Sequence, residues 1–371
     1  MMSNQLPRWV EYGLIPLLNL TAAFLVSGLV VLWIGENPLN AVQSLVYGAL
    51  GYGEGIGYTL FYATNFVFTG LACAVAYQAG LFSIGAEGQA YLGGLGVALV
   101  CLALGGWSWW AALPIVLVAA AGFGAGWAAI PAYLQAKRGS HIVITTIMFN
   151  FIASALMVYL LVDRLSYGSM QPETRPFGDS LQLPLARDTI TFIDFGQSPL
   201  NLATVFALLA LVFVWFLIWR TKLGYEMRTF GTNPTAAAYA GISPFKITMV
   251  AMTISGALAG LMALNEVMGA SNRLILEFVS GSGFVGIAVA LMGRNHPIGI
   301  LLAALLFGIL YQGGAELAFD SPGITRDMIV VIQGLVILFA GGLEHMFRPA
   351  LVALFGRQAR RKAARAAAQG A

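Results

Sequence analysis

The chain has 371 residues, of which 9% are charged and 59% are hydrophobic, and its formal net charge is +3. A soluble domain of average composition carries roughly a quarter charged residues, so this chain has too few to build a water-facing surface. These values exclude a soluble globular protein and predict an all-α membrane protein that is solvated by lipid. In a bilayer, the length suits one bundle of about ten helices of roughly 20 residues each. The 44 glycines fit this class, because small residues let membrane helices approach closely.

Ten apolar stretches follow one another along the chain, and each is predicted to cross the membrane as a helix. The first has no small-residue cleavage site after it, so it is predicted to be a retained helix and not a cleaved signal peptide. The eighth is short and glycine-rich, so it is predicted to be tilted or to cross only in part. The stretches are 14–35, 57–79, 89–106, 108–130, 142–162, 199–219, 246–268, 277–293, 298–318 and 326–345.

Lysine and arginine are distributed unevenly between the segments that join these stretches. With the N-terminus inside, fourteen of the 19 basic residues fall on the cytoplasmic side, which is the bias that sets membrane orientation. Ten crossings return the chain to its starting side, so both termini are predicted to be cytoplasmic, in a bacterial inner membrane. Residues 1–355 then form the transmembrane domain, and residues 356–371 form a basic cytoplasmic tail. The long loop at 163–198 lies outside, as a docking surface or a tolerated insertion, and the loop at 220–246 lies inside.

The segment Gly80–Gln89, GLFSIGAEGQ, places two polar side chains, Glu87 and Gln89, among glycines between the second and third stretches. Helices that are broken at membrane depth are tolerated only where they are buried in protein or line a water-filled cavity. The free backbone groups at such a break suit a polar solute. The segment is therefore predicted to lie on a substrate path. The alternative is structural: Glu87 caps a helix and accepts hydrogen bonds from backbone N–H groups without meeting solute.

Other polar and aromatic residues interrupt or flank the apolar stretches. Asn65 and Asn150 either line the path or join helices by hydrogen bonds, as buried amides often do in membranes. Asn265 and Glu266 in the seventh stretch are also candidates for joining helices by hydrogen bonds. Phe82 and Phe284 flank glycine-rich breaks and suit stacking on a base or a sugar. The predicted substrate path consists of Asn65, Phe82, Ser83, Glu87, Gln89 and Asn150.

The inner loop contains a short predicted helix, about Pro234 to Ala240, because Asn233 is a good N-cap and Gly241 a good stop. Its small, flat face suits a groove on another protein. No GxxxxGK[ST] phosphate loop occurs in the chain, so it cannot bind ATP by that device. The predicted coupling residues are Gly231, Asn233, Pro234, Ala237, Tyr239, Ala240 and Gly241.

Two glycine-rich breaks, 80–88 and 281–286, follow stretches that run in opposite directions. Paired breaks in oppositely oriented halves are typical of inverted repeats around a central site. We therefore expect broken helices and inverted repeats in the fold.

Three segments together resemble the permease family of ABC importers for nucleosides and simple sugars, over residues 57 to 345. Gly80–Gln89 resembles the family signature GLFNIGxEGQ, with Ser83 where Asn is usual. Gly231–Ile242, GTNPTAAAYAGI, resembles its cytoplasmic coupling motif, and Ala290–Gly299, ALMGRNHPIG, resembles its turn between the eighth and ninth helices. The long loop at 163–198 resembles that of the longer member of a pair of non-identical permeases.

The resemblance implies transport by alternating access with no covalent chemistry on this chain. It implies an ATP-binding subunit that holds ATP and Mg²⁺, a second permease, and an extracytoplasmic solute-binding protein as partners. We expect membrane lipid around the chain, no cofactor or metal bound by it, no catalytic residue, and no nucleic acid polymer as a partner.

Two other transport classes stay open from the residues. A branched-chain amino acid permease of the ABC type shares the fold class. An ion-driven secondary transporter would need intramembrane carboxylates, for which Glu87 and Glu266 are the candidates. An intramembrane enzyme is disfavoured, because the three histidines are far apart in sequence and form no metal or nucleophile cluster with acidic residues or serine.

Overall fold

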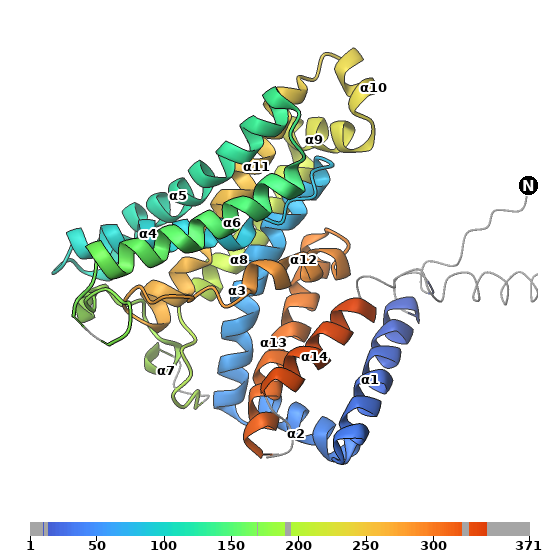
Figure 1. Cartoon of the computed structure of the whole chain (residues 1–371), viewed down its shortest axis with the longest axis vertical. Coiled ribbons are helices and arrows are strands. Elements are labelled where there is room, and N and C mark those ends of the chain that lie inside the picture. The colour runs from blue at the N-terminus through green and yellow to red at the C-terminus, as the bar shows by residue number, and fades with distance from the viewer. Residues whose placement is uncertain (1–9, 11–13, 169, 190–193, 321–325, 340–371) are drawn as a thin grey trace, which may run out of the picture. The chain divides into compact units, whose positions relative to one another are not determined.

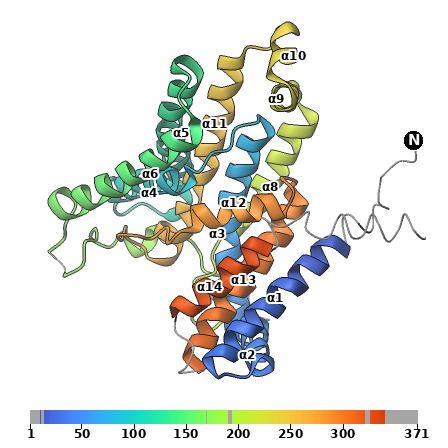
Figure 2. The same ribbon diagram turned by 45° about the vertical axis from the view of Figure 1, so that its right-hand side comes forward.

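The computed structural model describes residues 10, 14–168, 170–189, 194–320 and 326–339, and within them the chain is helical, with two isolated β-bridges and no strand. Its helices are shown in Figures 1 and 2. They are α1 (Ile15–Ile34), α2 (Pro38–Leu50), α3 (Gly53–Gln78), α4 (Ala86–Ala103), α5 (Trp109–Arg138), α6 (Ile142–Tyr159), α7 (Ala186–Thr189), α8 (Ala203–Arg220), α9 (Lys222–Thr232), α10 (Pro234–Tyr239), α11 (Pro244–Leu261), α12 (Ser282–Met292), α13 (Pro297–Asp320) and α14 (Arg326–Ile337). The predicted all-α class is confirmed.

Seven of the ten predicted crossings are helices long and apolar enough to span a membrane. They begin at Gly53, Ala86, Trp109, Ile142, Ala203, Pro244 and Pro297. π-Helical turns extend two of them, so that α6 continues through Leu160–Arg164 and α11 is followed by Leu264–Ala270.

The other three predicted crossings are not confirmed as spans. The helices α1 and α2 reach the span criterion only as a bent pair, which would make eight spans within the described residues. Helix α12 has 11 residues, and a helix of that length rises about 16 Å, roughly half of a bilayer's hydrocarbon core. The described part of α14 has 12 residues, and the end of the predicted crossing, at 345, lies outside the described residues, as does the tail 356–371.

The chain forms two compact units, one of residues 45–313 and the other of residues 1–44 and 314–371. In the second unit, α1 packs against α14 through an apolar cluster. The cluster contains Val31, Ala41, Leu317, Ile329 and Ile332. All the predicted path and coupling residues belong to the first unit.

Within residues 45–313, α3 is the most buried of the spans and packs against α8, α11 and α12. Glycines bring neighbouring helices into backbone contact. A Cβ on Gly256 of α11 would collide with the backbone of Gly124 on α5, and one on Gly93 of α4 would collide with Gly260. Close approach through small residues replaces the hydrophobic effect as a source of helix association in lipid. These contacts agree with the prediction that the many glycines let the membrane helices approach closely.

The predicted outer loop is tied to the segment that joins α11 to α12. Thr174 donates its N–H to the Leu274 carbonyl at 3.0 Å, and Glu173 forms a bridge with Ile275. The Arg273 guanidinium lies 3.0 Å from the Glu173 carboxylate. The described part of 163–198 is therefore hydrogen-bonded to the segment before α12. Whether it is a docking surface or a tolerated insertion stays a prediction.

Candidate functional site

Two helix breaks meet at Glu87. The first break is the non-helical segment between Gln78 and Ala86, and the second precedes α12, which begins at Ser282. The Glu87 carboxylate accepts hydrogen bonds from the backbone N–H groups of Gly281, at 3.0 Å, and Gly283, at 2.8 Å. Glu87 is the second residue of α4, so the N-terminal turns of α4 and α12 lie against each other.

Only glycine fits at position 283, where these two turns touch. A Cβ on Gly283 would collide with the backbone N–H of Glu87 and would lie 2.6 Å from its Cα. Helix N-termini carry a partial positive charge and unpaired N–H groups, and a buried carboxylate satisfies both. The placement of Glu87 corresponds to the structural alternative, that of a cap. A contact between Glu87 and solute stays a prediction.

Two side chains of α6 hold the first break in its extended conformation. Asn150 donates from Nδ2 to the Ile84 carbonyl at 2.7 Å, and its Oδ1 accepts from the Gly88 N–H at 3.0 Å. Thr146 accepts from the Ile84 N–H at 3.2 Å. Non-helical backbone at membrane depth must find such partners inside the protein. Asn150 is therefore engaged with the break. Thr146 was not singled out by the sequence, because a threonine in an apolar stretch, here next to Thr145, is unremarkable.

Asn65 belongs to a buried polar network between α3 and the π-helical turn that follows α11. Its Nδ2 donates to the Glu266 carboxylate at 2.6 Å, and its Oδ1 accepts from Asn265 at 2.8 Å. Asn201 donates to the Asn265 side chain at 3.0 Å. This network joins three segments that are far apart in the chain, which is the helix-joining alternative for Asn65. Asn201 carries no sequence signal, since it stands at the predicted end of a span, where polar residues are ordinary.

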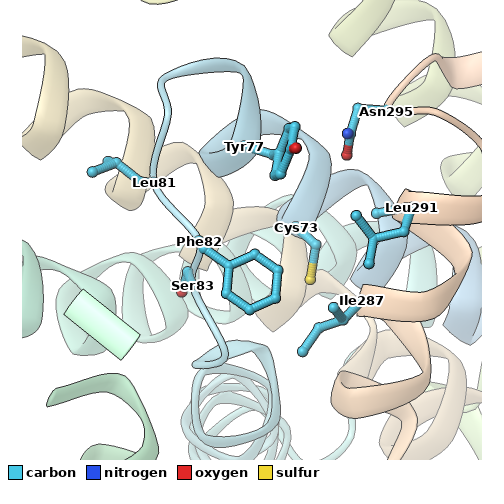
Figure 3. Close-up of a pocket in the computed structure, with 9 residues that line it drawn as sticks. Cys73, Tyr77, Leu81, Phe82, Ser83, Ile287, Leu291 and Asn295 are labelled. Carbon is cyan, nitrogen blue, oxygen red and sulfur yellow. The ribbon is translucent and has the colours of Figure 1, made fainter. Parts of the chain in front are cut away.

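Phe82, Ser83 and Gln89 complete the predicted path. The Phe82 ring is 40% exposed and faces a small cavity that Cys73 and Ile287 also line (Figure 3). The water-accessible space there is about 10 Å³, which is room for one water molecule. Small-molecule pockets measure roughly 300–1,000 Å³, so this cavity is too small for a solute, and the break packs closely against α12. Gln89 is 1% exposed, and its Oε1 has no hydrogen-bond partner among the described residues.

The short helix predicted at about Pro234 to Ala240 is confirmed as α10, Pro234–Tyr239. The Asn233 side chain accepts from the Ala236 N–H at 3.0 Å, and Pro234 occupies the first helical position. Gly241 ends the helix in the left-handed conformation, at φ +81°, with Ile242 donating to the Ala237 carbonyl. These are the cap and stop that the sequence predicts.

The faces of α10 differ from the prediction at one residue. Tyr239 is 91% exposed, as a docking surface requires, and Ala240 is also exposed. Ala237 is 0% exposed, because it faces the rest of its own chain. Ala237 was predicted to be part of the docking face and is instead the residue through which the helix packs on the permease.

Gly231, at the end of α9, lies against the first break. A Cβ on Gly231 would collide with the Gln78 carbonyl oxygen and would lie 2.8 Å from the Gly80 backbone nitrogen. Gly80 itself has a φ of +71°. The predicted coupling segment and the predicted path segment, about 150 residues apart in sequence, thus touch backbone to backbone. Among the described residues, no group of three His, Cys, Asp or Glu side chains is placed to hold a metal.

Comparison with known proteins identifies the family. A family model described as "Branched-chain amino acid transport system / permease component" matches residues 55–341. The chain is 33% identical over 328 residues to the nucleoside ABC transporter permease protein NupB of Lactococcus lactis, covering 88% of this chain and 90% of that protein. It is 34% identical over 331 residues to the guanosine ABC transporter permease protein NupP of Bacillus subtilis, covering 89% and 93%.

A third relative is the glucose ABC transporter permease protein TsgB13 of Haloferax volcanii, which is 33% identical over 348 residues, covering 90% of this chain and 88% of that protein. No solved structure gives a significant match. The matched range contains both helix breaks and the whole loop 220–246. This chain is a member of the permease family that the model describes.

Proposed function

We propose that this chain is the transmembrane permease subunit of an ABC importer for nucleosides or simple sugars. One observation carries the proposal: relatives named for a nucleoside, guanosine and glucose are at least 33% identical to it over about nine-tenths of its length. The same names favour this solute class over a branched-chain amino acid. An ion-driven mechanism is disfavoured too, since both of its candidate carboxylates are engaged, Glu87 with backbone N–H groups and Glu266 with Asn65.

The free energy for transport would come from ATP hydrolysis on a partner subunit that binds α10. The chain carries no phosphate loop, so its movement must be imposed by contact. Helix α10 is capped at both ends and exposes Tyr239, which gives a partner a rigid aromatic anchor. From α10, motion reaches the first break through the contact between Gly231 and Gly80. A second, non-identical permease and an extracytoplasmic solute-binding protein complete the proposed importer.

The proposed orientation, with both termini and α10 in the cytoplasm, rests on the charge distribution, and the contacts agree with its grouping of segments by side. The charge distribution assigns the α3–α4 turn, the α9–α10 loop and the α12–α13 turn to the inside. In the structure, Gly80 contacts Gly231, and Gln78 donates to the Asn295 carbonyl at 3.2 Å. At the other side, the predicted outer loop binds the segment before α12. Segments assigned to one side therefore contact one another.

Solute would pass where the first break meets α12. The small cavity beside Phe82 lies between these two elements. To admit a nucleoside, the break must move away from α12, and the exposed Phe82 ring is placed to stack on a base as it does so. The unpartnered Oε1 of Gln89 is an acceptor for a sugar hydroxyl or a base N–H group.

The proposal is tested by transport in proteoliposomes. The chain is reconstituted with a second permease, an ATP-binding subunit and a solute-binding protein of the same transporter class, and ATP-dependent uptake of labelled uridine, guanosine, ribose and glucose is measured. Leucine is the matched negative solute. The Tyr239→Ala variant, which changes an exposed side chain only, should abolish uptake of every solute while the chain still inserts. Leucine uptake, or uptake that needs an ion gradient and no ATP, would refute the assignment.

A further inference from the structure

An apolar groove lies away from the site described above, between α8 and α13. Its volume is about 210 Å³, and its lining is Leu211, Val212, Trp215, Pro297, Ile298 and Leu301. Two of these side chains are strongly exposed within this chain, Val212 at 63% and Ile298 at 65%. A groove of this composition on a membrane protein must be filled by hydrocarbon, from lipid or from a neighbouring helix, because water there would cost free energy.

One end of the groove carries a positive charge. Arg220 is the last residue of α8, and its guanidinium carbon lies 5.2 Å from the centre of the Trp215 ring, which lines the groove. Arg220 forms no ion pair with any carboxylate in the part of the chain that the structure describes. A guanidinium that stacks on an aromatic face keeps its N–H edges free for an oxyanion. The adjacent Trp219 packs on His296, with ring centres 5.0 Å apart, directly before Pro297 of the groove.

A second cation, on the side that the charge distribution assigns to Arg220 as well, has the features of a membrane–water interface. Lys137, at the end of α5, lies over the Phe245 ring at 5.0 Å, so a second cation stacks on an aromatic residue at the end of a span. Long basic side chains and Trp residues concentrate at this depth because their apolar bodies sit in lipid while their charges reach the headgroups. Arg220 is therefore at the level at which lipid phosphates lie.

We propose that the groove and Arg220 form a binding site for one anionic phospholipid. An acyl chain lies along the α8–α13 groove, and the phosphate or acidic headgroup binds the Arg220 guanidinium. Charge complementarity selects the occupant: basic groups at the headgroup level between membrane helices attract anionic lipids. A protein partner would need a carboxylate and an apolar side chain at the same spacing, whereas a bilayer supplies both groups of the lipid in one molecule.

The test measures lipid retained by the purified full-length chain. The chain in detergent is exchanged against phosphatidylglycerol or phosphatidylcholine, and bound lipid is counted by native mass spectrometry. We expect phosphatidylglycerol to bind more tightly, and Arg220→Gln to weaken it roughly fivefold without changing phosphatidylcholine. Ile298→Trp, which fills the groove, should displace both lipids. Lys222→Gln is the matched control, because Lys222 is at the same end but pairs with Glu226 at 3.9 Å, and it should leave binding unchanged.

Three results would overturn the site. If Arg220→Gln binds phosphatidylglycerol like the parent chain, Arg220 is not the headgroup ligand. If Lys222→Gln weakens binding as much as Arg220→Gln does, the attraction is a general effect of positive charge and not a site at Arg220. The third result is efficient cross-linking, in the assembled importer, of a cysteine placed at Ile298 to another permease. That result would assign the groove to a subunit interface. None of these outcomes depends on which solute the importer carries.

Discussion

Gly231→Ala tests the route by which the cytoplasmic loop acts on the first helix break. Gly231 is a helical residue of α9, so alanine suits its backbone and should favour the helix by about 1 kcal/mol. The new methyl group, however, would collide with the Gln78 carbonyl oxygen and lie 3.1 Å from the carbonyl carbon of Ala79. These are backbone atoms, which cannot turn aside as a flexible side chain does. Any loss of function must therefore come from this contact.

The magnitude follows from the cost of overpacking. An extra methyl group in a tight contact costs typically about 1–3 kcal/mol, and α9 can avoid that cost by separating from the break. The same free energy lowers the equilibrium constant for the contact between α9 and the break, which links α10 to the break, about 5- to 150-fold. Helix α10 keeps its own caps and its exposed Tyr239, so the ATP-binding subunit should still associate. We expect ATP hydrolysis to persist but to lose most of its stimulation by solute and receptor.

The assay compares solute-stimulated ATP hydrolysis, uptake and subunit association in proteoliposomes. The matched control is Gly126→Ala in α5, because a Cβ there meets no atom within 4 Å. It should retain stimulation and uptake. If Gly231→Ala assembles and shows the stimulation of the parent complex, the contact between Gly231 and Gly80 does not transmit motion. Loss of subunit association in Gly231→Ala would also contradict the reasoning, since α10 should be undisturbed.

Four further predictions concern the topology, the helix junction, the polar network around Asn65, and the path. Cysteines introduced at Ser180 and Arg360 should react with an impermeant reagent from the outside and the inside respectively, and the reverse pattern would refute the proposed orientation. Glu87→Gln should lower the free energy of unfolding by about 1–3 kcal/mol, because the amide offers one acceptor oxygen where the carboxylate offers two to the buried N–H groups. An unchanged melting temperature would contradict the role of Glu87 as a cap. Asn65→Ala should destabilise the fold by a similar amount, since it leaves the Glu266 carboxylate unpaired. Gln89→Ala removes an oxygen that has no partner among the described residues, so it should lower uptake at an unchanged free energy of unfolding. If Gln89→Ala destabilises the fold as much as Asn65→Ala does, Gln89 is a structural residue.

Much of the fold follows from local patterns. Seven predicted crossings appear as helices because a run of about 20 apolar residues has one low-energy state in lipid, in which every backbone N–H and C=O is bonded within the helix. The coupling helix was equally predictable, because Asn233, Pro234 and Gly241 act on their immediate neighbours. The eighth crossing was harder, since hydropathy does not show whether an apolar run is one helix or an irregular approach followed by 11 helical residues.

The site depends on contacts between distant segments, which no local pattern reports. The sequence identified Glu87 as an unusual carboxylate, but its acceptance of two N–H groups from α12, almost 200 residues later, decides that it can act as a cap. Composition marked Ala237 as part of a small-residue face, and packing on its own chain buries it. Thr146 and Asn201 are ordinary residues in sequence and become important only through their partners.

The sequence by itself determined the lipid environment, most of the helices, the capped helix α10 and, through its motifs, the family. These properties depend on residue type, spacing and hydrogen bonds between near neighbours. Only the tertiary structure decided that the two helix breaks meet, that Gly231 touches Gly80, and that an apolar groove ends beside Arg220. The two contacts between the breaks and at Gly231, and the two walls of the groove, each join residues more than 70 positions apart, and packing between helices brings such residues together.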